Sequence, residues 1–434
     1  MNYILELINQ KNYFMKKVLF LFIVLATILT SCKTKDKCTD TICPNGQVCV
    51  DGTCQGSTTN VLITSNISVN TVWTNDNVYE LAGRITILDG VTLSIEPGTI
   101  IKGQAGTGSN ATALLVARGG KLVANGSSAL PIIFTSVADE ITPEQVANGN
   151  FISPNLDANT SGLWGGVIVL GKAPISASAS EIQIEGIPTT DANGLYGGSE
   201  PNDNSGIIRY VSIRHGGANI GNGNEINGLT LGGVGVATTI ENIEIVGNQD
   251  DGIEFFGGTV NVKNLIVWNS GDDAIDTDQS WAGTLDNFIV ICGGATDHAL
   301  EIDGPEGTYL AGHTLINGSV KGSPEAELGD FRACPRGSFS NIFFFDFTDP
   351  ALAGRGDLSI SNPTNNTCST DNLTNGVLTF SNLQAILPTN VTLNSVFKNG
   401  TSSYATSVTT RTVGANKSVF NWTWSEQANQ LISF

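Results

Sequence analysis

The amino-acid sequence predicts an all-β protein wound as a parallel β-helix, with a C-terminal β cap closing its end. Three stretches in the middle of the chain share one pattern: an asparagine, an alternating apolar run, a turn of Gly, Asn and Asp, and a second short alternating run. They are residues 241–258, 263–280 and 286–304. Two short strands in every period of roughly 20–30 residues are typical of a solenoid whose coils stack on one another.

The register of side chains within these stretches supports the same fold. Apolar residues recur at a period of two, and we expect them to form columns inside the coil. These residues are Ile243 and Ile245, Leu265 and Val267, and Phe288 and Val290. Asn242, Asn264 and Asn287 share a register too, which predicts a ladder of side-chain amides at a corner with left-handed backbone. Fifty glycines and only 14% charged residues favour tight turns between short strands.

The N-terminal segment, residues 1–31, is interpreted as a signal peptide whose true start is Met15. Two lysines precede an apolar run, residues 18–30, that is too short to span a bilayer comfortably. The run ends in Leu-Thr-Ser-Cys, which resembles a bacterial lipobox. The resemblance implies that Cys32 carries a lipid and that the protein is anchored in the outer membrane, exposed at the cell surface. An ordinary cleaved signal peptide and an anchor helix are the alternatives.

Residues 32–58 are predicted to form a small stalk stapled by disulfides. The stretch has almost no apolar side chains and cannot bury a core, so two disulfides are its expected stabilisation in an oxidising compartment. The cysteines are Cys38, Cys43, Cys49 and Cys54, and three connectivities are open. Their spacing resembles a truncated EGF-like module. Zinc binding is the alternative, which the wide spacing and the lack of a nearby histidine disfavour.

The predicted β-helix covers residues 59–345. Its first coils are residues 86–103 and 113–136, and residues 162–175 continue them after a polar excursion at 137–161. At about 23 residues per coil, this length gives roughly twelve coils.

Beyond residue 345 the period is lost. Residues 346–434 are rich in Ser, Thr and Asn and are predicted to form the β cap that covers the open edge. Cys334 and Cys368 are predicted to form a disulfide, and Cys292, in an apolar strand, a buried free thiol.

The charge of the chain excludes one class of partner. The formal net charge is −19, with 40 acidic and 21 basic residues. Binding to nucleic acid depends on basic side chains that neutralise phosphates. We therefore predict no nucleic-acid partner.

Six segments together resemble a known group of proteins. They read SIEPGTIIKG, LLVARGGKLVANG, GLWGGVIVLGKAPI, EINGLTLGGVG, DDGIEFFGGTV and DDAIDTD, spread over about residues 70–330. As a set they resemble the right-handed parallel β-helix surface lipoproteins of Bacteroidetes, whose fold is pectate-lyase-like. The resemblance implies a right-handed coil and a surface location. It implies no common activity.

Stacking the three repeats places acidic residues in columns. One column holds Asp250, Asp272 and Asp297; the next holds Asp251, Asp273 and His298; a third, beyond an apolar position, holds Glu254, Asp276 and Glu301. Because alternate residues of a strand face opposite sides, the third column is expected to face outward. Neighbouring coils lie ~4.8 Å apart, so these side chains crowd one patch of surface.

The sharpest enzymatic hypothesis for this patch is an inverting glycoside hydrolase, which uses one carboxyl as acid and one to activate water. The layout is similar to polygalacturonase-like enzymes, whose successive coils carry N-x-D, D-D and G-H-G, followed by R-x-K. The resemblance implies these catalytic residues: Asp251 (with Asn248), Asp272, Asp273 and His298. Asp297 and Ala299 replace the glycines beside the histidine. No R-x-K follows, which leaves Arg332 as the nearby candidate for binding an acidic sugar.

Divalent cation binding is a second hypothesis for the patch. Like charges this close repel, and a Ca²⁺ ion with six to eight oxygen ligands would relieve the repulsion. The candidate ligands are Asp272, Asp276, Asp278, Glu301 and Asp303. A calcium-dependent lyase would also need a strong base, and these coils offer only Lys263. A third hypothesis is a solvated acidic face that keeps the β rod soluble.

Other residue types attract functional hypotheses more weakly. Trp268 and Trp281 flank the acidic coil and are candidates for stacking on sugar rings, although a tryptophan in a strand more often belongs to the core. His215 and His313 are single histidines beside turns and are interpreted as structural. Residues 355–357 spell the integrin-type tripeptide Arg-Gly-Asp, interpreted as a chance match in a glycine-rich loop.

The sequence therefore favours a non-catalytic binding or adhesion scaffold whose ligands are glycans, because a long flat β face suits extended polymers. The alternative is a polysaccharide-degrading enzyme centred on Asp272, Asp273 and His298. A structural spacer that binds neither ligand nor metal is the third class.

Overall fold

The computed structural model describes residues 47–50, 53–56, 59–221, 226–353 and 355–434. The chain divides into two units, Met1–Ser57 and Thr58–Phe434. In the first unit, β1 (Gln47–Val50) and β2 (Thr53–Gly56) form an antiparallel hairpin with Cys49 opposite Cys54 in the backbone register. The predicted signal peptide, Cys32, Cys38 and Cys43 lie outside the described residues.

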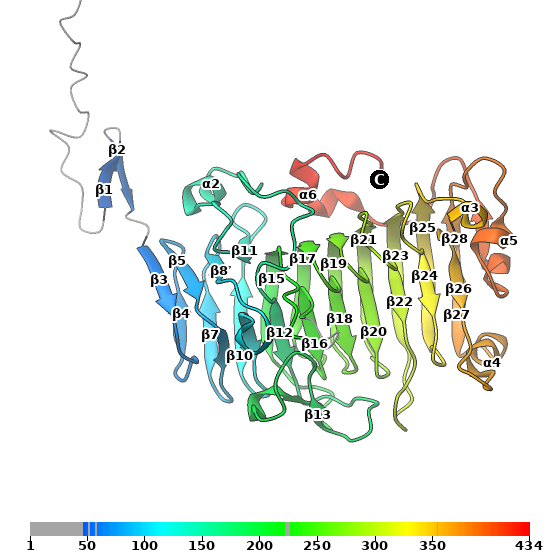
Figure 1. The fold of residues 1–434 in the computed structure, drawn as a ribbon, viewed down its shortest axis with the longest axis horizontal. Helices are drawn as coiled ribbons and strands as arrows, with labels where there is room; N and C mark the ends of the chain where they lie inside the picture. Colours follow the sequence, from blue (N-terminus) through cyan, green and yellow to red (C-terminus); the bar gives the residue numbers. More distant parts are fainter. Residues whose placement is uncertain (1–46, 51–52, 57–58, 222–225, 354) are drawn as a thin grey trace, which may run out of the picture. The chain divides into compact units, whose positions relative to one another are not determined.

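The second unit is a stack of coils whose strands pair in parallel from one coil to the next (Figure 1). The main path of the sixteen-stranded sheet contains twelve strands in the described chain: β3 (Thr59–Ile63), β5 (Asn77–Leu81), β8 (Ile100–Gly103), β11 (Ile132–Ser136), β15 (Gly206–Arg214), β17 (Thr239–Asn248), β19 (Asn261–Ser270), β21 (Thr284–Ile291), β23 (His313–Lys321), β25 (Gly337–Phe345), β28 (Leu383–Ala385) and β29 (Ala405–Ser407). Beside this path lie β4 (Thr71–Trp73), β7 (Thr92–Ile95), β10 (Lys121–Asn125) and β27 (Leu378–Ser381). The sequence prediction of a parallel β-helix is confirmed.

A second, nine-stranded sheet closes each coil. Its strands are β6 (Arg84–Ile87), β9 (Ala113–Val116), β12 (Val167–Leu170), β16 (Leu229–Gly232), β18 (Ile253–Phe256), β20 (Ile275–Asp278), β22 (Leu300–Ile302), β24 (Gly329–Phe331) and β26 (Leu358–Ile360). A small antiparallel pair, β13 (Ile182–Gln183) and β14 (Leu195–Tyr196), lies in an insertion. The helices are short: α2 (Pro143–Ala147), α3 (Pro350–Ala353), α4 (Cys368–Thr374), α5 (Leu393–Val396), α6 (Trp424–Gln427), and the 3₁₀ turns η1 (Gly108–Asn110), η2 (Ala192–Gly194), η3 (Thr401–Tyr404) and η4 (Lys417–Phe420). Within the described residues, no helix is long and apolar enough to cross a bilayer.

The predicted asparagine ladder is present, and a second run of ladder asparagines follows it later in the chain. The amide of Asn264 donates to Asn242 Oδ1 at 3.0 Å, and Asn287 donates to Asn264 Oδ1 at 2.7 Å. All three have left-handed backbone, with φ near +60°, where asparagine is tolerated better than most residues. In a second run, Asn341 donates to Asn317 Oδ1 and Asn382 donates to Asn341 Oδ1, each at 3.2 Å. The two runs are not bonded to each other, because Asn317 donates to Asp286 Oδ1 at 2.8 Å and Asn287 Oδ1 accepts the N–H of Asn416. Each ladder residue bends its strand, so that a long strand contributes to two faces of the coil.

The interior of the coils is filled by the predicted apolar columns. Ile243, Leu265 and Phe288 occupy one register, and the column continues to Gly318. The phenyl ring of Phe288 fills the space that a side chain at Gly318 would need. Glycine is therefore required there by the size of the neighbouring ring.

The outer face of the sixteen-stranded sheet is covered by two segments. The polar excursion at 137–161 contains α2 and packs Val146 and Phe151 on β8 and β11. The C-terminal segment, residues 413–434, lies along β17 to β25 (Figure 1). The indole of Trp424 packs against that of Trp268. These contacts bury apolar side chains that point away from the coil interior.

The coils extend further than the sequence predicted. Strands β26 to β29 pair in parallel with earlier coils, so the β-helix continues past residue 345 to Ser407. The expected β cap over residues 346–434 differs accordingly: its first part forms coils, and residues 413–434 form η4 and α6 and lie along the side of the stack. The period is hidden because loops with α3, α4 and α5 separate the last strands.

Two cysteine predictions for the second unit are confirmed. Cys334 and Cys368 form a disulfide that closes a separation of 34 residues. Cys292 is a buried free cysteine, and burial raises the pKa of its thiol to about 12. Such a thiol is inert packing material rather than a nucleophile.

Candidate functional site

The outward side chains of β18 to β24 in the nine-stranded sheet form an acidic face, which contains the residues predicted from the sequence. Strand pairing aligns three outward columns. They are Asp251, Asp273, His298 and Glu327; Glu254, Asp276, Glu301 and Asp330; and Phe256, Asp278, Asp303 and Arg332. Earlier on the same sheet the outward residues are apolar, as in Ile168 and Leu170, and the insertion with β13 and β14 packs on them. The chemistry of the sheet thus changes along the stack from apolar to acidic.

The first column is tied together by bonds from carboxylate to backbone. Asp251 Oδ1 accepts the N–H of Asp273 at 2.9 Å, and Asp273 Oδ1 accepts the N–H of His298 at 2.8 Å. Each aspartate thereby fixes the turn of the following coil, and the sequence register of the three residues is confirmed. A buried N–H without such an acceptor would cost stability.

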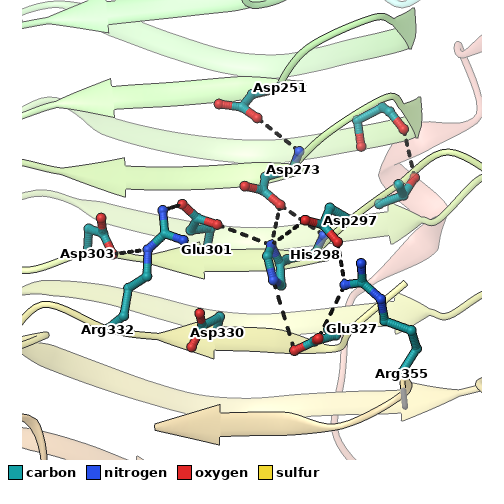
Figure 2. A network of polar contacts seen from close by, with 12 residues as sticks. Asp251, Asp273, Asp297, His298, Glu301, Asp303, Glu327, Asp330, Arg332 and Arg355 are labelled. Carbon is teal, nitrogen blue, oxygen red and sulfur yellow. Dashed lines mark hydrogen bonds and ion pairs between the residues drawn. The ribbon is translucent and has the colours of Figure 1, made fainter. Parts of the chain in front are cut away.

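His298 lies at the centre of a network of carboxylates (Figure 2). Its Nδ1 lies 2.7 Å from Asp273 Oδ1 and 3.1 Å from Glu301 Oε2, and its Nε2 lies 4.0 Å from Glu327 Oε2. Burial acts to lower the pKa of His298, but the hydrogen bond and the charge of Asp273, with those of Asp297 and Glu327, outweigh it and raise the pKa. The arrangement favours the imidazolium, which donates through Nδ1 to Asp273 and is paired with the charges of Glu301 and Glu327.

This raised pKa predicts a pH-dependent contribution to stability. The contribution of His298 is fully present below about pH 6.5, its ordinary pKa, and is lost as the pH rises through the higher folded-state value. The melting temperature of wild type minus that of His298→Gln should therefore shrink between pH 6 and pH 9. The charged groups that face the imidazole are Asp273, Asp297, Glu301, Glu327, Asp330 and Arg355.

The other histidines serve as the reference for that experiment. Burial lowers the pKa of His313 to about 3, and burial lowers that of His215 as well. Their contributions change as the pH falls below about 6.5 and leave the alkaline range unaffected. A difference between wild type and His298→Gln that grows with rising pH would contradict the network.

Two arginines form ion pairs with four of the acids in this half of the face. Arg332 donates through Nε to Asp303 Oδ1 at 2.8 Å and also contacts Glu301. Arg355 donates to Glu327 Oε1 at 3.2 Å and also contacts Asp297. The coils β22 and β24 therefore carry their own counter-charges.

The Arg-Gly-Asp tripeptide belongs to this network and is not displayed as a ligand. Arg355 is held by Asp297 and Glu327, and Asp357 is buried, with an ion pair of 2.8 Å to Lys398. The interpretation as a chance match agrees with this geometry.

The other half of the face, on β18 and β20, has a different balance. Asp251, Glu254 and Asp276 are buried, and one carboxylate oxygen from each lies within 4.8 Å of the other two. Burial, followed by the neighbouring carboxylates, raises the pKa of all three groups well above the ordinary value. The amide of Asn227 donates to Glu254.

The predicted catalytic residues are brought together only in part. Asp251, Asp273 and His298 are consecutive in one column, but Asp273 is 4% exposed and both described hydrogen bonds of its carboxylate are to His298. Asp272 lies at an exposed turn, where its carboxylate is within 4.8 Å of those of Asp250 and Asp251. Arg332 contacts Glu301 and Asp303 instead. Inversion needs a water between two carboxyls, and the buried Asp273 is already engaged by the imidazole.

The predicted calcium ligands are distributed over three places. Asp276 belongs to the buried group with Asp251 and Glu254, and Asp272 lies in the exposed turn. Glu301 and Asp303 are bound by Arg332. Burial and nearby acids raise the pKa of Asp278 to about 6.

The structure corrects the expectation that two tryptophans stack on sugar rings. Trp281 is 0% exposed; its ring stacks on Phe255 at 3.9 Å between centroids and its Nε1 donates to Val260 O at 2.9 Å. Trp268 is buried under Trp424 of the C-terminal segment. Both are packing residues, because one lies in the coil interior and the other beneath a covering segment.

Sequence reasoning missed the fourth coil of the acidic face. Glu327 and Asp330 continue the columns of His298 and Glu301, but Glu327 follows His298 by 29 residues, after a longer loop. In the observed register HALEID (298–303) aligns with ELGDFR (327–332), and the shared acidic position followed by an apolar residue is the signal that a variable period would have found.

Sequence reasoning also missed an open polar pocket of about 540 Å³ between the insertion and a corner of the early coils. Its lining mixes carboxylates, cations, an amide and hydroxyls: Asp89, Arg118, Lys172, Asn193, Ser199 and Glu200. Arg118 shapes one wall by donating to Gly197 O at 3.0 Å and pairing with Glu181 at 2.8 Å. The residues come from segments far apart in the sequence, which is why no motif reveals them.

Residues 64–427 match the model of one protein family, described as a pectate-lyase-like beta helix domain. No curated protein and no solved structure matches the chain.

Proposed function

The chain belongs to the pectate-lyase-like β-helix family, and from the sites on its coils we propose that it is a non-catalytic binding scaffold for glycans. We propose further that a lipid on Cys32 anchors it in the outer membrane with the β-helix at the cell surface. Residues 32–58, stapled by their cysteines as an EGF-like stalk, would separate the coils from the anchor. No nucleic acid is involved in this function.

The observation that carries the glycan proposal is the open polar pocket beside the insertion. Sugar hydroxyls both donate and accept hydrogen bonds, and the pocket offers acceptors such as Asp89 and Glu200 beside donors such as Lys172 and Asn193. Binding sites typically combine a concave surface with a few convergent polar groups. A scaffold needs no reacting group, which accords with the engagement of Asp273 and His298 in a buried network.

The proposal is tested with a glycan array probed by the full chain and two pocket variants. Lys172→Ala and Glu200→Gln each remove one charged hydrogen-bonding group, and we expect the affinity for the bound glycan to fall by roughly tenfold or more. Lys263→Ala is the matched control, because Lys263 is an exposed lysine on β19, outside the pocket lining. Equal affinity in wild type and pocket variants would contradict the pocket as the binding site.

The same array distinguishes the scaffold from the polysaccharide-degrading alternative. The contact between Asp273 and His298 is the feature that supports an enzyme. Released reducing ends that disappear in Asp273→Asn would establish turnover and overturn the scaffold. Binding without turnover in both proteins supports it. The anchor is tested by Cys32→Ala, which should move the protein from the membrane fraction to the soluble fraction.

A further inference from the structure

The acidic face is neutralised unevenly. On β22 and β24, the carboxylates of Glu301, Asp303 and Glu327 meet Arg332, Arg355 or His298. On β18 and β20, Asp251, Glu254 and Asp276 form no ion pair with a Lys, Arg or His side chain among the described residues. One half of the face thus supplies its own cations and the other half does not.

The three uncompensated acids are buried rather than solvated. Their side chains are 6–7% exposed, so water neutralises them poorly, and the desolvation of an unpaired carboxylate is costly. Glu254 and Asp276 are direct neighbours on adjacent strands. Asp251 lies two residues before the start of β18. The geometry brings one oxygen from each within 4.8 Å of the others.

A second observation points to a ligand at this place. The side-chain oxygen of Asn227 is buried and has no hydrogen-bond partner, although the amide nitrogen of the same group contacts Glu254. Asp276 Oδ1 is buried without a hydrogen-bond partner as well. Buried polar atoms are nearly always satisfied in proteins, and an exception calls for an explanation such as an ion. Asn227 is adjacent to the group of three acids through its contact with Glu254, and Asp276 is one of the three, so both unpartnered oxygens belong to residues of this cluster.

We propose that Asp251, Glu254 and Asp276, with the side-chain oxygen of Asn227, bind one divalent cation on the acidic face. All donors are hard oxygens, and this set is the chemistry that Ca²⁺ prefers, with water completing its six to eight ligands. The set differs from the one predicted from sequence, since Asp276 alone is shared. The cation would neutralise the carboxylates at β18 and β20, as Arg332 and Arg355 neutralise those they contact at β22 and β24.

Protonation is the competing explanation for three close, buried acids. Burial and mutual repulsion raise the pKa of each group, and a neutral carboxyl needs no counter-ion. The two explanations differ in what a metal does. A cation site responds to CaCl₂ at neutral pH with a defined stoichiometry, and a proton-sharing cluster does not.

The experiment uses the full chain, treated with chelator and titrated with CaCl₂ by calorimetry, with melting temperatures measured in parallel. We expect one ion per chain and a rise of a few degrees in melting temperature at about 100 times Kd. Glu254→Gln and Asp276→Asn keep the side-chain shapes and should weaken Ca²⁺ binding at least tenfold. Asp330→Asn is the matched control, because Asp330 lies in the same column two coils beyond Asp276 and outside the group of three; it should bind Ca²⁺ like wild type.

The metal-free proteins keep the test independent of folding defects. Without metal, Glu254→Gln should melt no lower than wild type, because it removes an uncompensated buried charge. No heat and no melting shift with CaCl₂ in wild type would overturn the cation site. If Asp330→Asn weakened Ca²⁺ binding as much as Glu254→Gln and Asp276→Asn do, the proposed site would also be overturned, because the ion would then be attracted by the charge of the whole face. MgCl₂ in place of CaCl₂ tests the choice of ion, and tighter Mg²⁺ binding would contradict the assignment to Ca²⁺.

Discussion

Replacing Glu244 with alanine is expected to destabilise the β-helix by about 3–5 kcal/mol, because it leaves Arg214 charged and buried without its counter-ion. Both side chains are fully buried, with Arg214 Nη2 3.6 Å from Glu244 Oε2. Ser212 Oγ links them, since it donates to Glu244 at 2.7 Å and accepts from Arg214 Nε at 2.8 Å. The measurement is the free energy of unfolding by urea, followed by circular dichroism.

The same substitution should release the C-terminal segment. Glu244 Oε1 accepts both the N–H and the hydroxyl of Ser425 at 2.9 Å, and Trp424 stacks over the Arg214 guanidinium. We therefore expect residues 413–434 to become sensitive to limited proteolysis in Glu244→Ala before the coils themselves unfold.

Glu241→Ala is the matched control for this prediction. Glu241 lies on the same strand and pairs with Arg209 at 2.5 Å, but both side chains are about one-third exposed. An exposed pair is worth about 0–1 kcal/mol. If Glu244→Ala cost no more than Glu241→Ala, the buried pair would have no special role. Replacing Arg214 and Glu244 together with methionine and leucine should restore much of the loss.

Trp281→Ala is expected to cost about 3–5 kcal/mol of stability, because it empties the centre of the coil interior. The indole stacks between Phe255 and the imidazole of His313, whose centroid lies 5.0 Å away. Substitutions of Trp281 therefore distinguish a role in packing from a role in stacking on sugar rings. Unfolding by urea measures the first, and the glycan array measures the second.

The controls for Trp281 are a smaller change at the same site and an aromatic residue elsewhere. Trp281→Phe keeps a ring but loses the bond to Val260, so it should cost less than the alanine variant. Tyr309→Ala removes an aromatic side chain that is 37% exposed and should change stability little. Loss of glycan binding in Trp281→Ala while the protein stays folded would contradict the packing role.

The parts of the fold that follow from local rules could be predicted from the sequence. Asn242, Asn264 and Asn287 are separated by nearly constant spacings, so their ladder is visible as a repeat. The later ladder residues Asn317, Asn341 and Asn382 follow loops of different length, and the period disappears although the coil geometry persists. Loop length changes spacing but not the geometry of the coil to which the chain returns.

The sequence predicts which residues of the candidate site share a column, but not which residues from distant segments contact them. The columns of Asp251, Asp273 and His298 follow from strand alternation, and the structure has them in line. The sequence contains no sign that Arg355, 57 residues beyond His298 along the chain, would balance Asp297. Burial of Trp268 depends on Trp424, which lies 156 residues further along the chain. Such pairings are set by which segments cover which face, and no local pattern encodes that.

The position of the C-terminal segment also has a consequence for how the chain is made. The N–H of Phe151 donates to Gln427 Oε1 across 276 residues, and Trp422 packs beside Val146 and Phe151. Coils can stack one after another as synthesis proceeds, since each contacts its neighbours. Their apolar outer face nevertheless stays uncovered until residues 413–434 have been synthesised and delivered. A partly synthesised stack therefore exposes apolar surface that is prone to aggregation, and completion of the fold waits for the last segment of the chain.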